Sequence, residues 1–503
     1  MFVYVLTPYV RTAPDFNCLP SPPRLPSRRA ADNKIGASYS CESAATLGDL
    51  KNPQGLNFSG FVLTDWEGAH STVDAALAGL DMEMPDADYL GPALLAAVEA
   101  GTVPATRLDD MALRVLTPMF AAGIFDIPNN GTMDSNATSP AHNALSREIA
   151  AAGTVLLQNR GGLLPLSAPA AGQRLSIAVI GDDASASPQC CITGSGAVTP
   201  PYVITPLEGV SARAGPNANV SYTRTPSAAG VAAVAALAAA ADVAIVCVSV
   251  SSGEGSDRAS LNLSAIDTQL LAAVTAAQPR TVVVLHVPGA VVMPWADAAG
   301  AIVAAWFPGS EMGSSLADIL FGDVNPSGRL PVTFPVLESD TPMQTPEQYP
   351  GVDGVVNYTE KLLIGHRWFD AKNVTPRFPF GHGESYSSFT YSSLYIDSTS
   401  YAPNVTASFA LSNSGARDGF ECPQLYLTFP AATEGEPPRV LRGFKRVFVS
   451  TAVGGQAVQF VLQPRDMSIW STESYAWQLQ RGEFTVSIGA SSRDIRLTGT
   501  FTL

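Results

Sequence analysis

The pattern of hydrophobic and polar positions divides the chain into three parts with different periodicities. In the first part, residues 33–127, short apolar runs alternate with amphipathic stretches. The run at residues 61–64 predicts a buried strand that ends at Asp65 and Trp66. Three later segments have helical periodicity and predict helices: residues 71–80, 93–100 and 108–122. Alternating strands and helices are typical of a β/α architecture.

The second part, residues 141–388, contains apolar runs separated by helical stretches. These runs predict strands at residues 175–180, 241–250, 281–286 and 301–306. The alternation predicts a parallel sheet covered by helices, which is an α/β sandwich. Ligands bind such sheets in the loops that follow the carboxyl ends of the strands. Three loops are therefore candidate parts of a site: residues 194–196, 253–258 and 306–311.

The third part, residues 389–503, alternates apolar and polar positions in short segments such as 483–488 and 496–501. This pattern and this length predict a β-sandwich of the size of an immunoglobulin-like module. Residues 128–140 are rich in Asn, Thr and Ser and predict a linker, whereas residues 1–32 show no periodicity and predict an irregular leader. The fold class is therefore α/β multidomain, with a β-sandwich at the C-terminal end.

One apolar stretch, residues 230–250, has the length of a membrane span. It contains Asp242, and there its character changes from an Ala-rich helical pattern to a β-branched one. A helix that leads into a buried parallel strand explains this change better than a span does. We therefore expect no membrane association.

Composition narrows the class of protein further. The chain is 46% hydrophobic and 15% charged, which suits a globular protein. A net charge of −15 argues against nucleic acid as a partner. The six cysteines form no C-x-x-C pair and only five histidines are present, so no metal site is expected. Cys247 lies in an apolar run and is predicted to be a core thiol, whereas Cys190 or Cys191 can form a disulfide in an oxidising compartment.

Glycosylation sequons indicate an extracellular protein. Asn-x-Ser/Thr occurs at eight positions: Asn57, Asn130, Asn136, Asn219, Asn262, Asn357, Asn373 and Asn404. We therefore expect a secreted glycoprotein. The first residues lack the cationic start and the sustained apolar run of a signal peptide, and we therefore expect the true N-terminus to lie outside this sequence.

The strongest chemical candidate is Asp65. A carboxylate at the carboxyl end of a parallel strand in a barrel-like segment lies where such folds place catalytic groups. Trp66 beside it offers an aromatic surface on which the C–H face of a sugar can stack. The alternative interpretation of Asp65 by itself is an N-cap for the following helix.

The surrounding motifs resemble those of glycoside hydrolase family 3. They run in order through residues 60–66, 75–85, 155–166, 253–258, 325–331, 381–386 and 484–494, so the resemblance covers about residues 33–503. It implies a (β/α)8-type barrel, an α/β sandwich and a fibronectin-type-III-like domain, and it implies no cofactor. In this family the aspartate of Ser/Thr-Asp-Trp, here Asp65, is the nucleophile of a retaining β-glucosidase.

Retaining hydrolysis also requires a second carboxyl group as acid/base. Glu360 lies in a segment that resembles the one carrying this residue in fungal-type and bacterial members of the family. Lys361 follows it where the family usually has Gly. Glu254, in the loop at 253–258, is the alternative, because plant-type members take their acid/base from about this region. We favour Glu360 and interpret Glu254 as part of the wall of the site.

Other residues that the resemblance places at the substrate are Trp66, Tyr39 and Ser195. Trp66 is expected in the leaving-group subsite, and tryptophan there favours glucosides over xylosides. We therefore predict exo-acting hydrolysis of terminal β-D-glucosyl residues from small β-glucosides or oligosaccharides. The alternatives are a non-catalytic carbohydrate-binding or cell-wall protein, and a β-xylosidase or N-acetylglucosaminidase of the same family. The oligomeric state is left open.

One family feature is missing. The early barrel strands of the family carry an Asp, an Arg and a Lys-His pair that hold the glucosyl hydroxyls. This chain has no Lys-His pair, and residues 1–32 match nothing in the family. We therefore expect an N-terminally truncated member that lacks most of the first barrel domain. Such a chain would be a weak enzyme, because hydroxyl contacts supply much of the transition-state binding.

Overall fold

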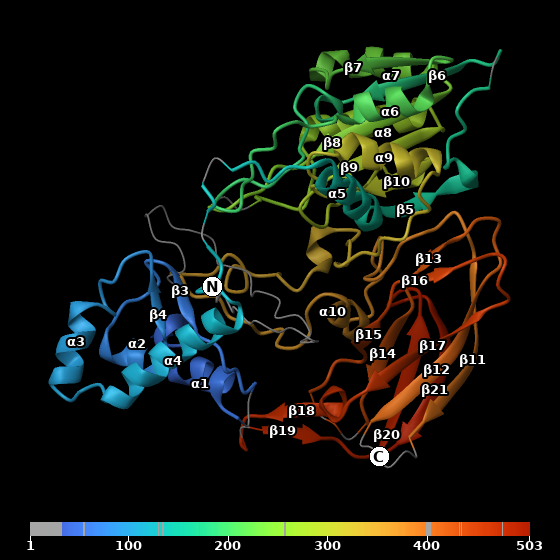
Figure 1. The fold of residues 1–503 in the computed structure, drawn as a ribbon. Coiled ribbons are helices and arrows are strands. Elements are labelled where there is room, and N and C mark those ends of the chain that lie inside the picture. The colour runs from blue at the N-terminus through green and yellow to red at the C-terminus, as the bar shows by residue number, and fades with distance from the viewer. Residues whose placement is uncertain are drawn as a thin grey trace. The chain divides into compact units, whose positions relative to one another are not determined.

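The computed structural model describes residues 33–53, 56–128, 130–132, 135–170, 172–255, 258–398, 404–431, 433, 435–474 and 476–503. The leader expected at residues 1–32 lies outside this range. The described residues form two compact units (Figure 1). The first unit ends at Asn136 and includes residues 468–479, and the second contains residues 137–467 and 480–503. In the described part, no helix is long and apolar enough to cross a membrane.

The first unit contains a small βαβ element. Strands β3 (Leu63–Trp66) and β4 (Met82–Met84) are parallel, and α2 (Val73–Ala78) connects them. The other elements of this unit are β1 (Lys34–Ile35), β2 (Ser38–Tyr39), η1 (Ser40–Glu42), α1 (Ala44–Lys51), α3 (Pro92–Glu99), α4 (Ala105–Ala121), β18 (Ser468–Ser471) and β19 (Ala476–Leu479). The parallel strands with flanking helices agree with the β/α architecture predicted for residues 33–127.

Strand β3 begins two residues later than the apolar run predicts. Phe61 and Val62 are buried, but their backbone does not join a ladder. The Val62 N–H instead donates to a carboxylate oxygen of Asp81 at 2.7 Å. The Val62 carbonyl accepts the N–H groups of Asp81 and Met82. A side-chain acceptor therefore replaces a strand partner at this point, and hydrophobicity alone does not reveal it.

The second unit contains a six-stranded sheet in the order β5-β10-β9-β8-β6-β7. Its strands are β5 (Val155–Asn159), β6 (Leu175–Ile180), β7 (Ala218–Thr223), β8 (Val243–Ser249), β9 (Thr281–His286) and β10 (Ala301–Ala304). All neighbours are parallel except β5 and β10, which are antiparallel. The α/β sandwich is thus confirmed, with an antiparallel edge strand in addition.

Helices cover both faces of this sheet. Alternate residues of β8 point to opposite sides, where α7 (Val231–Ala239) and α8 (Ala265–Ala277) cover one face and α6 (Pro206–Ala214) and α9 (Met312–Phe321) the other. Cys247 is buried in the second of these cores, as predicted. The remaining helices of this unit are α5 (Pro140–Gly153), α10 (His366–Ala371), η2 (Arg160–Gly162), η3 (Asp182–Ala184), η4 (Ala228–Gly230), η5 (Ala296–Ala298), η6 (Glu338–Asp340) and η7 (Pro464–Met467).

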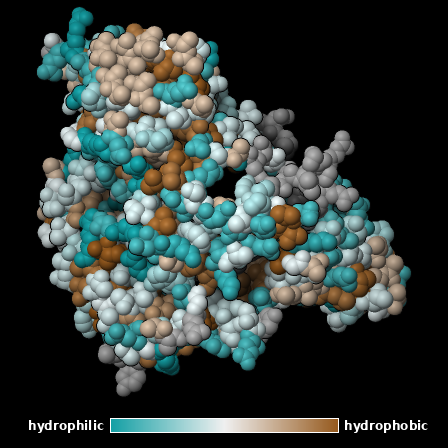
Figure 2. All heavy atoms as spheres, turned by 180° about the vertical axis from the view of Figure 1, so that it is seen from behind, coloured by the Kyte–Doolittle hydropathy of each residue, from teal (hydrophilic) through white to brown (hydrophobic). Residues whose placement is uncertain are grey.

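The C-terminal part of the second unit is a β-sandwich, as predicted. One sheet has the order β11-β12-β17 and the other β15-β14-β20-β21. The strands are β11 (Phe389–Asp397), β12 (Val405–Asn413), β13 (Gly419–Glu421), β14 (Gln424–Thr428), β15 (Val440–Phe444), β16 (Val447–Val449), β17 (Gln456–Leu462), β20 (Glu483–Gly489) and β21 (Ile495–Thr502). On the face of the molecule that Figure 2 shows, hydrophobic residues form small separate patches among hydrophilic ones, which is ordinary for a protein surface.

Candidate active site

Asp65 is the third residue of β3, at the carboxyl end of the parallel pair. The preceding Thr64 is fully buried, and its hydroxyl accepts the Met84 N–H at 2.9 Å. Asp65 itself is partly exposed, and its Oδ1 accepts the N–H of Trp66 at 2.7 Å. The N-cap of α2 is Thr72, so the alternative interpretation of Asp65 as a helix cap is wrong. The Asp65 carboxylate does not cap helix α2.

A tight turn follows the aspartate. The Gly68 N–H donates to the Asp65 carbonyl at 3.1 Å, and the Glu67 N–H donates to the Met84 carbonyl at 3.0 Å. Glu67 has a φ of 59°, a conformation that is unfavourable for a residue with a Cβ. Trp66 leaves 53% of its surface exposed at this turn. The local backbone therefore carries a partly exposed carboxylate and an exposed indole on consecutive residues.

A buried ion-pair cluster anchors the start of β3. The two carboxylate oxygens of Asp81 accept hydrogen bonds from Lys51 Nζ at 2.5 Å, from Arg107 Nη2 at 2.8 Å and from the Val62 N–H at 2.7 Å. Arg107 also donates to the carbonyls of Ala76 and Leu80. Burial lowers the pKa of Lys51, and the bond to Asp81 acts in the opposite direction. Asp81 thus links α1 and α4 to the start of the strand that carries Asp65.

Tyr39 lies on the same unit as Asp65, at the end of β2. Its ring stacks on His70 with 3.8 Å between ring centroids, and the Lys34 ammonium lies 4.5 Å from the tyrosine ring. The nearby Cys41 is buried, and burial raises the pKa of its thiol to about 11. Tyr39 therefore has a fixed orientation, and Cys41 is a core residue.

In the second unit, the three loops predicted from the sequence come together. Thr193 and Gly253 form a parallel bridge, and the Gly309 N–H donates to the Cys190 carbonyl at 2.9 Å. These residues follow β6, β8 and β10, whose carboxyl ends lie at one edge of the sheet. The loops after β6 and β8 approach so closely that a Cβ at Gly253 would lie 1.7 Å from the Thr193 hydroxyl oxygen.

Ser195 and Glu254 are joined by a hydrogen bond. The Ser195 N–H donates to Glu254 Oε2 at 2.7 Å. Gly194 has a φ of 97°, and a Cβ there would lie 2.4 Å from that of Glu254. Both Ser195 and Glu254 are exposed. Asp257, in the same loop, lies outside the described residues.

Glu360 is partly exposed, in an irregular segment before α10. The segment is fastened by hydrogen bonds: Gln348 Nε2 donates to the Thr359 hydroxyl at 2.8 Å, and the Asn357 N–H donates to the Glu347 carbonyl at 2.9 Å. Lys361 has a φ of 52°. That left-handed conformation explains why the departure from Gly at this position matters, since Gly adopts it without a steric cost.

His366, the first residue of α10, is half-buried close in sequence to Glu360. Its ring stacks on Phe380 with 4.8 Å between centroids and meets Tyr426 edge-on. Burial lowers the pKa of His366 to about 4. The helix that follows the Glu360 segment is therefore packed around a neutral imidazole.

The candidate residues divide between the two units. Asp65, Trp66 and Tyr39 belong to the first, whereas Ser195, Glu254 and Glu360 belong to the second. Hydrogen bonds join Asp65 to Trp66 in the first unit and Ser195 to Glu254 in the second.

Sequence reasoning missed the supporting residues. Asp81, in the first unit, lies within the motif at residues 75–85, but the motif does not reveal its role. In the second unit, the buried side chains of Asp183 and His286 share a 2.5 Å hydrogen bond that the sequence pattern does not predict. The available signal in the second case was an aspartate three residues after the buried strand β6, since charged residues are rarely buried without a partner.

Comparison with known proteins shows the family. Residues 154–386 match the Glycosyl hydrolase family 3 C-terminal domain, and residues 421–492 match a Fibronectin type III-like domain. The chain is 37% identical to "Probable beta-glucosidase L" of Emericella nidulans, over 94% of this chain and 70% of that protein. The chain belongs to glycosyl hydrolase family 3. It is therefore a glycoside hydrolase, as its sequence motifs predicted.

Solved structures agree with this family 3 assignment. The Beta-D-glucoside glucohydrolase from Trichoderma reesei superposes with a TM-score of 0.83 at 34% identity, over 93% of this chain and 71% of that one. A beta-glucosidase from Streptomyces venezuelae, solved in complex with D-glucose, gives a TM-score of 0.83 at 28% identity, over 92% and 74% of the two chains. The family 3 chain described here thus spans about 70% of the length of its relatives.

Proposed function

We propose that this family 3 chain is a retaining, exo-acting β-D-glucosidase that hydrolyses terminal non-reducing β-D-glucosyl residues of cellobiose, oligosaccharides and small β-glucosides. The names of its relatives support glucose as the sugar that is released, since these proteins are called beta-glucosidases. The observation that carries the proposal is the geometry at Asp65. Its carboxylate is partly exposed at the end of β3 and accepts the N–H of Trp66, the next residue, whose indole is exposed.

In the proposed reaction, the Asp65 carboxylate attacks the anomeric carbon while the bond from that carbon to the leaving oxygen breaks. Glu360 donates its proton to the leaving oxygen, so that an alcohol departs and a glucosyl ester of Asp65 remains. Glu360, now a carboxylate, takes a proton from water, and the resulting hydroxide attacks the anomeric carbon and releases Asp65. Two inversions at the same carbon give overall retention.

The other candidates have binding roles in this proposal. The exposed Trp66 offers its face to the leaving-group sugar. Ser195 and Tyr39 contact the glucosyl unit. Glu254 holds the Ser195 backbone by its hydrogen bond and so shapes the wall of the site.

We also propose that the protein is extracellular and glycosylated. Seven of the eight sequon asparagines are exposed, namely Asn57, Asn130, Asn136, Asn219, Asn262, Asn357 and Asn373, and Asn404 is partly exposed. The disulfide between Cys190 and Cys191 supports the same compartment, because disulfides persist in oxidising environments. Loss of mass on enzymatic deglycosylation of the secreted protein is the expected result, and an unchanged mass would contradict glycosylation.

Matched variants test the catalytic roles. With an aryl β-D-glucoside, Asp65→Asn should lower kcat/KM by roughly 10⁴-fold or more. Asp74→Asn, an exposed carboxylate on α2, should leave it unchanged. Glu360→Gln should lower it by about 10²–10⁴-fold. The loss in kcat/KM should be smaller for substrates whose leaving group departs without a proton. Asp353→Asn, at an exposed carboxylate in the same segment, is the control and should leave kcat/KM unchanged.

Two further measurements separate the alternatives. Proton NMR of the first-formed glucose should show the β anomer, and the α anomer would refute retention. A higher kcat/KM on the aryl β-D-xyloside than on the β-D-glucoside would favour the β-xylosidase alternative. Sugar binding that persists without any hydrolysis would favour the carbohydrate-binding alternative. The expectation that this chain is a weak enzyme is tested by comparing its kcat/KM with that of a longer relative, which should be higher.

A further inference from the structure

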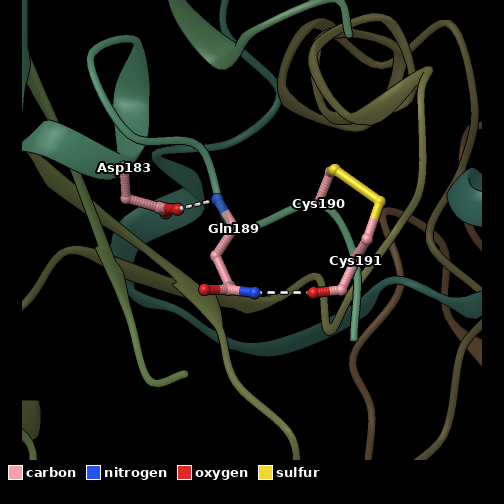
Figure 3. Close-up of a disulfide and its surroundings, with 4 residues drawn as sticks. All are labelled: Asp183, Gln189, Cys190 and Cys191. Atoms are coloured by element: carbon pink, nitrogen blue, oxygen red, sulfur yellow. Dashed lines mark hydrogen bonds between the residues drawn. A yellow bond between two sulfur atoms is a disulfide. The ribbon is translucent and has the colours of Figure 1, made fainter. Parts of the chain in front are cut away.

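Cys190 and Cys191 form a disulfide between neighbouring residues, in the loop that follows β6 (Figure 3). Their Cα atoms lie 3.8 Å apart, so the bond closes a ring within the pair and joins no distant segments. A disulfide that closes a long loop stabilises the whole fold by restricting the unfolded chain. This one closes the shortest possible loop, and its effect is therefore confined to the local backbone.

The carbonyls of the pair are fixed by two different partners. The Cys190 carbonyl accepts the Gly309 N–H at 2.9 Å, from the loop after β10. The Cys191 carbonyl accepts Gln189 Nε2 at 2.6 Å, as Figure 3 shows. The disulfide ring restricts the rotation of the peptide unit between the two residues, and both acceptors can then be satisfied at the same time.

Gln189 connects the pair to a buried anchor. Its N–H donates to Asp183 Oδ1 at 2.8 Å, and Asp183 Oδ2 shares a 2.5 Å hydrogen bond with His286 Nδ1 (Figure 3 shows the first of these bonds). Asp183 is 4% exposed and His286 is fully buried. The anchor therefore joins η3, the short helix after β6, to the last residue of β9.

Beyond the disulfide, the same loop reaches the candidate site. The Glu254 N–H donates to the Thr193 carbonyl, and the Ser195 N–H donates to Glu254 Oε2 at 2.7 Å. Thr193 and Ser195 are the second and fourth residues after Cys191. A change in the direction of the Cys191 peptide is thus carried directly into the bonds that hold Ser195.

We propose that the Cys190–Cys191 disulfide and Gln189 form a positioning element that sets Ser195 and Glu254 for substrate binding. The role of Ser195 rests on the proposed glucosidase function, but the positioning itself does not. A dithiol such as dithiothreitol opens the element: the S–S bond breaks, two S–H bonds form, and the dithiol supplies two electrons and two protons as it becomes a cyclic disulfide.

Hydrogen exchange measured by mass spectrometry tests the positioning without reference to activity. In the Cys190→Ala/Cys191→Ala variant, and in wild type reduced with dithiothreitol, the peptide containing the Ser195 amide should exchange at least roughly tenfold faster. Peptides of β9 should not change, and Tm should shift by less than about 2 °C, because the closed loop is so short. Cys422→Ala, at a free half-buried cysteine, is the control and should change neither. Unchanged exchange at Ser195 in both the variant and the reduced protein would overturn the proposal.

Gln189→Glu provides a second, independent test. At neutral pH its carboxylate would face the Cys191 carbonyl and repel it, whereas the protonated carboxyl can donate as the amide does. The ratio of Ser195 exchange in this variant to that in wild type should therefore exceed one at pH 7 and fall toward one between about pH 6 and 4. A ratio that does not vary with pH would contradict the role of Gln189.

Kinetics then connect the element to the reaction. The double alanine variant should show KM for an aryl β-D-glucoside raised roughly tenfold with a smaller change in kcat, because a substrate contact present before the transition state is misplaced. An unchanged KM in a variant whose Ser195 exchange has risen would remove the link to substrate binding. If wild type shows no glucosidase activity, the proposed function fails, and the exchange data still decide whether the element positions the loop.

Discussion

Replacing Asp81 with asparagine should destabilise the first unit by several kcal/mol, because its carboxylate holds two cations and one backbone N–H. The Asp81 side chain is fully buried, and the side chains of Lys51 and Arg107 are only 12% and 13% exposed. Asparagine keeps one acceptor oxygen but turns an N–H₂ donor toward a cation. With the amide oxygen in the place of Oδ2, the bond from Arg107 is lost, and the bond from Lys51 loses its charged acceptor. Hydrogen bonds to charged groups contribute about 1.5–3 kcal/mol each.

The loss should be moderated by the bonds that the cations keep. Lys51 still donates to the Gly79 carbonyl, and Arg107 still donates to two carbonyls and to Asp110. Breaking one partner of a buried pair typically costs about 3–5 kcal/mol, and we expect Asp81→Asn in this range. Burial already lowers the pKa of Lys51, and without Asp81 its main compensation is removed.

Asp110→Asn is the matched control. Asp110 pairs with Arg107 and Arg114, but its side chain is 44% exposed. Exposed ion pairs contribute about 0–1 kcal/mol, so the control should lose no more than that. The urea dependence of amide exchange at residues 62–66 reports the unfolding free energy of this unit alone. Equal losses in the two variants would refute the argument that Asp81 anchors β3.

Two further substitutions test the surroundings of Glu360. Lys361→Gly should raise the free energy of unfolding by about 0.5–1 kcal/mol, because Gly removes the steric cost of a left-handed φ; a loss measured by urea unfolding would contradict this. The pKa of His366 in the folded protein, about 4, lies below its value in the unfolded chain. The unfolded chain therefore binds the proton more tightly, and the free energy of unfolding falls as the pH is lowered from about 6.5 to 4. This loss amounts to about 3 kcal/mol. His366→Phe should flatten the dependence of stability on pH in that range, whereas His142→Gln, at an exposed histidine, should not.

Much of the α/β sandwich was predictable because its strands are buried on both faces. The predicted runs at residues 175–180 and 281–286 coincide with β6 and β9. The run at residues 301–306 ends earlier, at Ala304, because Trp306 has a φ of 60° and cannot continue a strand. The edge strand β7 was missed because it is only partly buried and carries a mixed pattern.

The candidate site was only partly predictable, for a different physical reason. Motifs identified Asp65 and the loops at the carboxyl edge of the sheet, and the structure brings those loops together. The groups that hold them were not predictable from hydrophobic patterns. Asp81 acts through hydrogen bonds with Lys51, Arg107 and the Val62 N–H, which are distant in sequence. Gln189 acts through one side-chain hydrogen bond to the carbonyl of Cys191, two residues along the chain. The sequence likewise indicated that Cys190 or Cys191 can form a disulfide, but it did not identify the partner.

The identity of the nucleophile is the central claim, and trapping the covalent intermediate tests it most directly. A 2-deoxy-2-fluoro-β-D-glucoside with a good leaving group forms the glycosyl-enzyme but slows its hydrolysis, since fluorine at C2 destabilises the oxocarbenium-like transition state. Peptide mass spectrometry should then find one fluoroglucosyl unit on the peptide containing Asp65, and none in Asp65→Asn. A label on another residue, or hydrolysis of β-glucosides without any labelling of Asp65, would contradict the account.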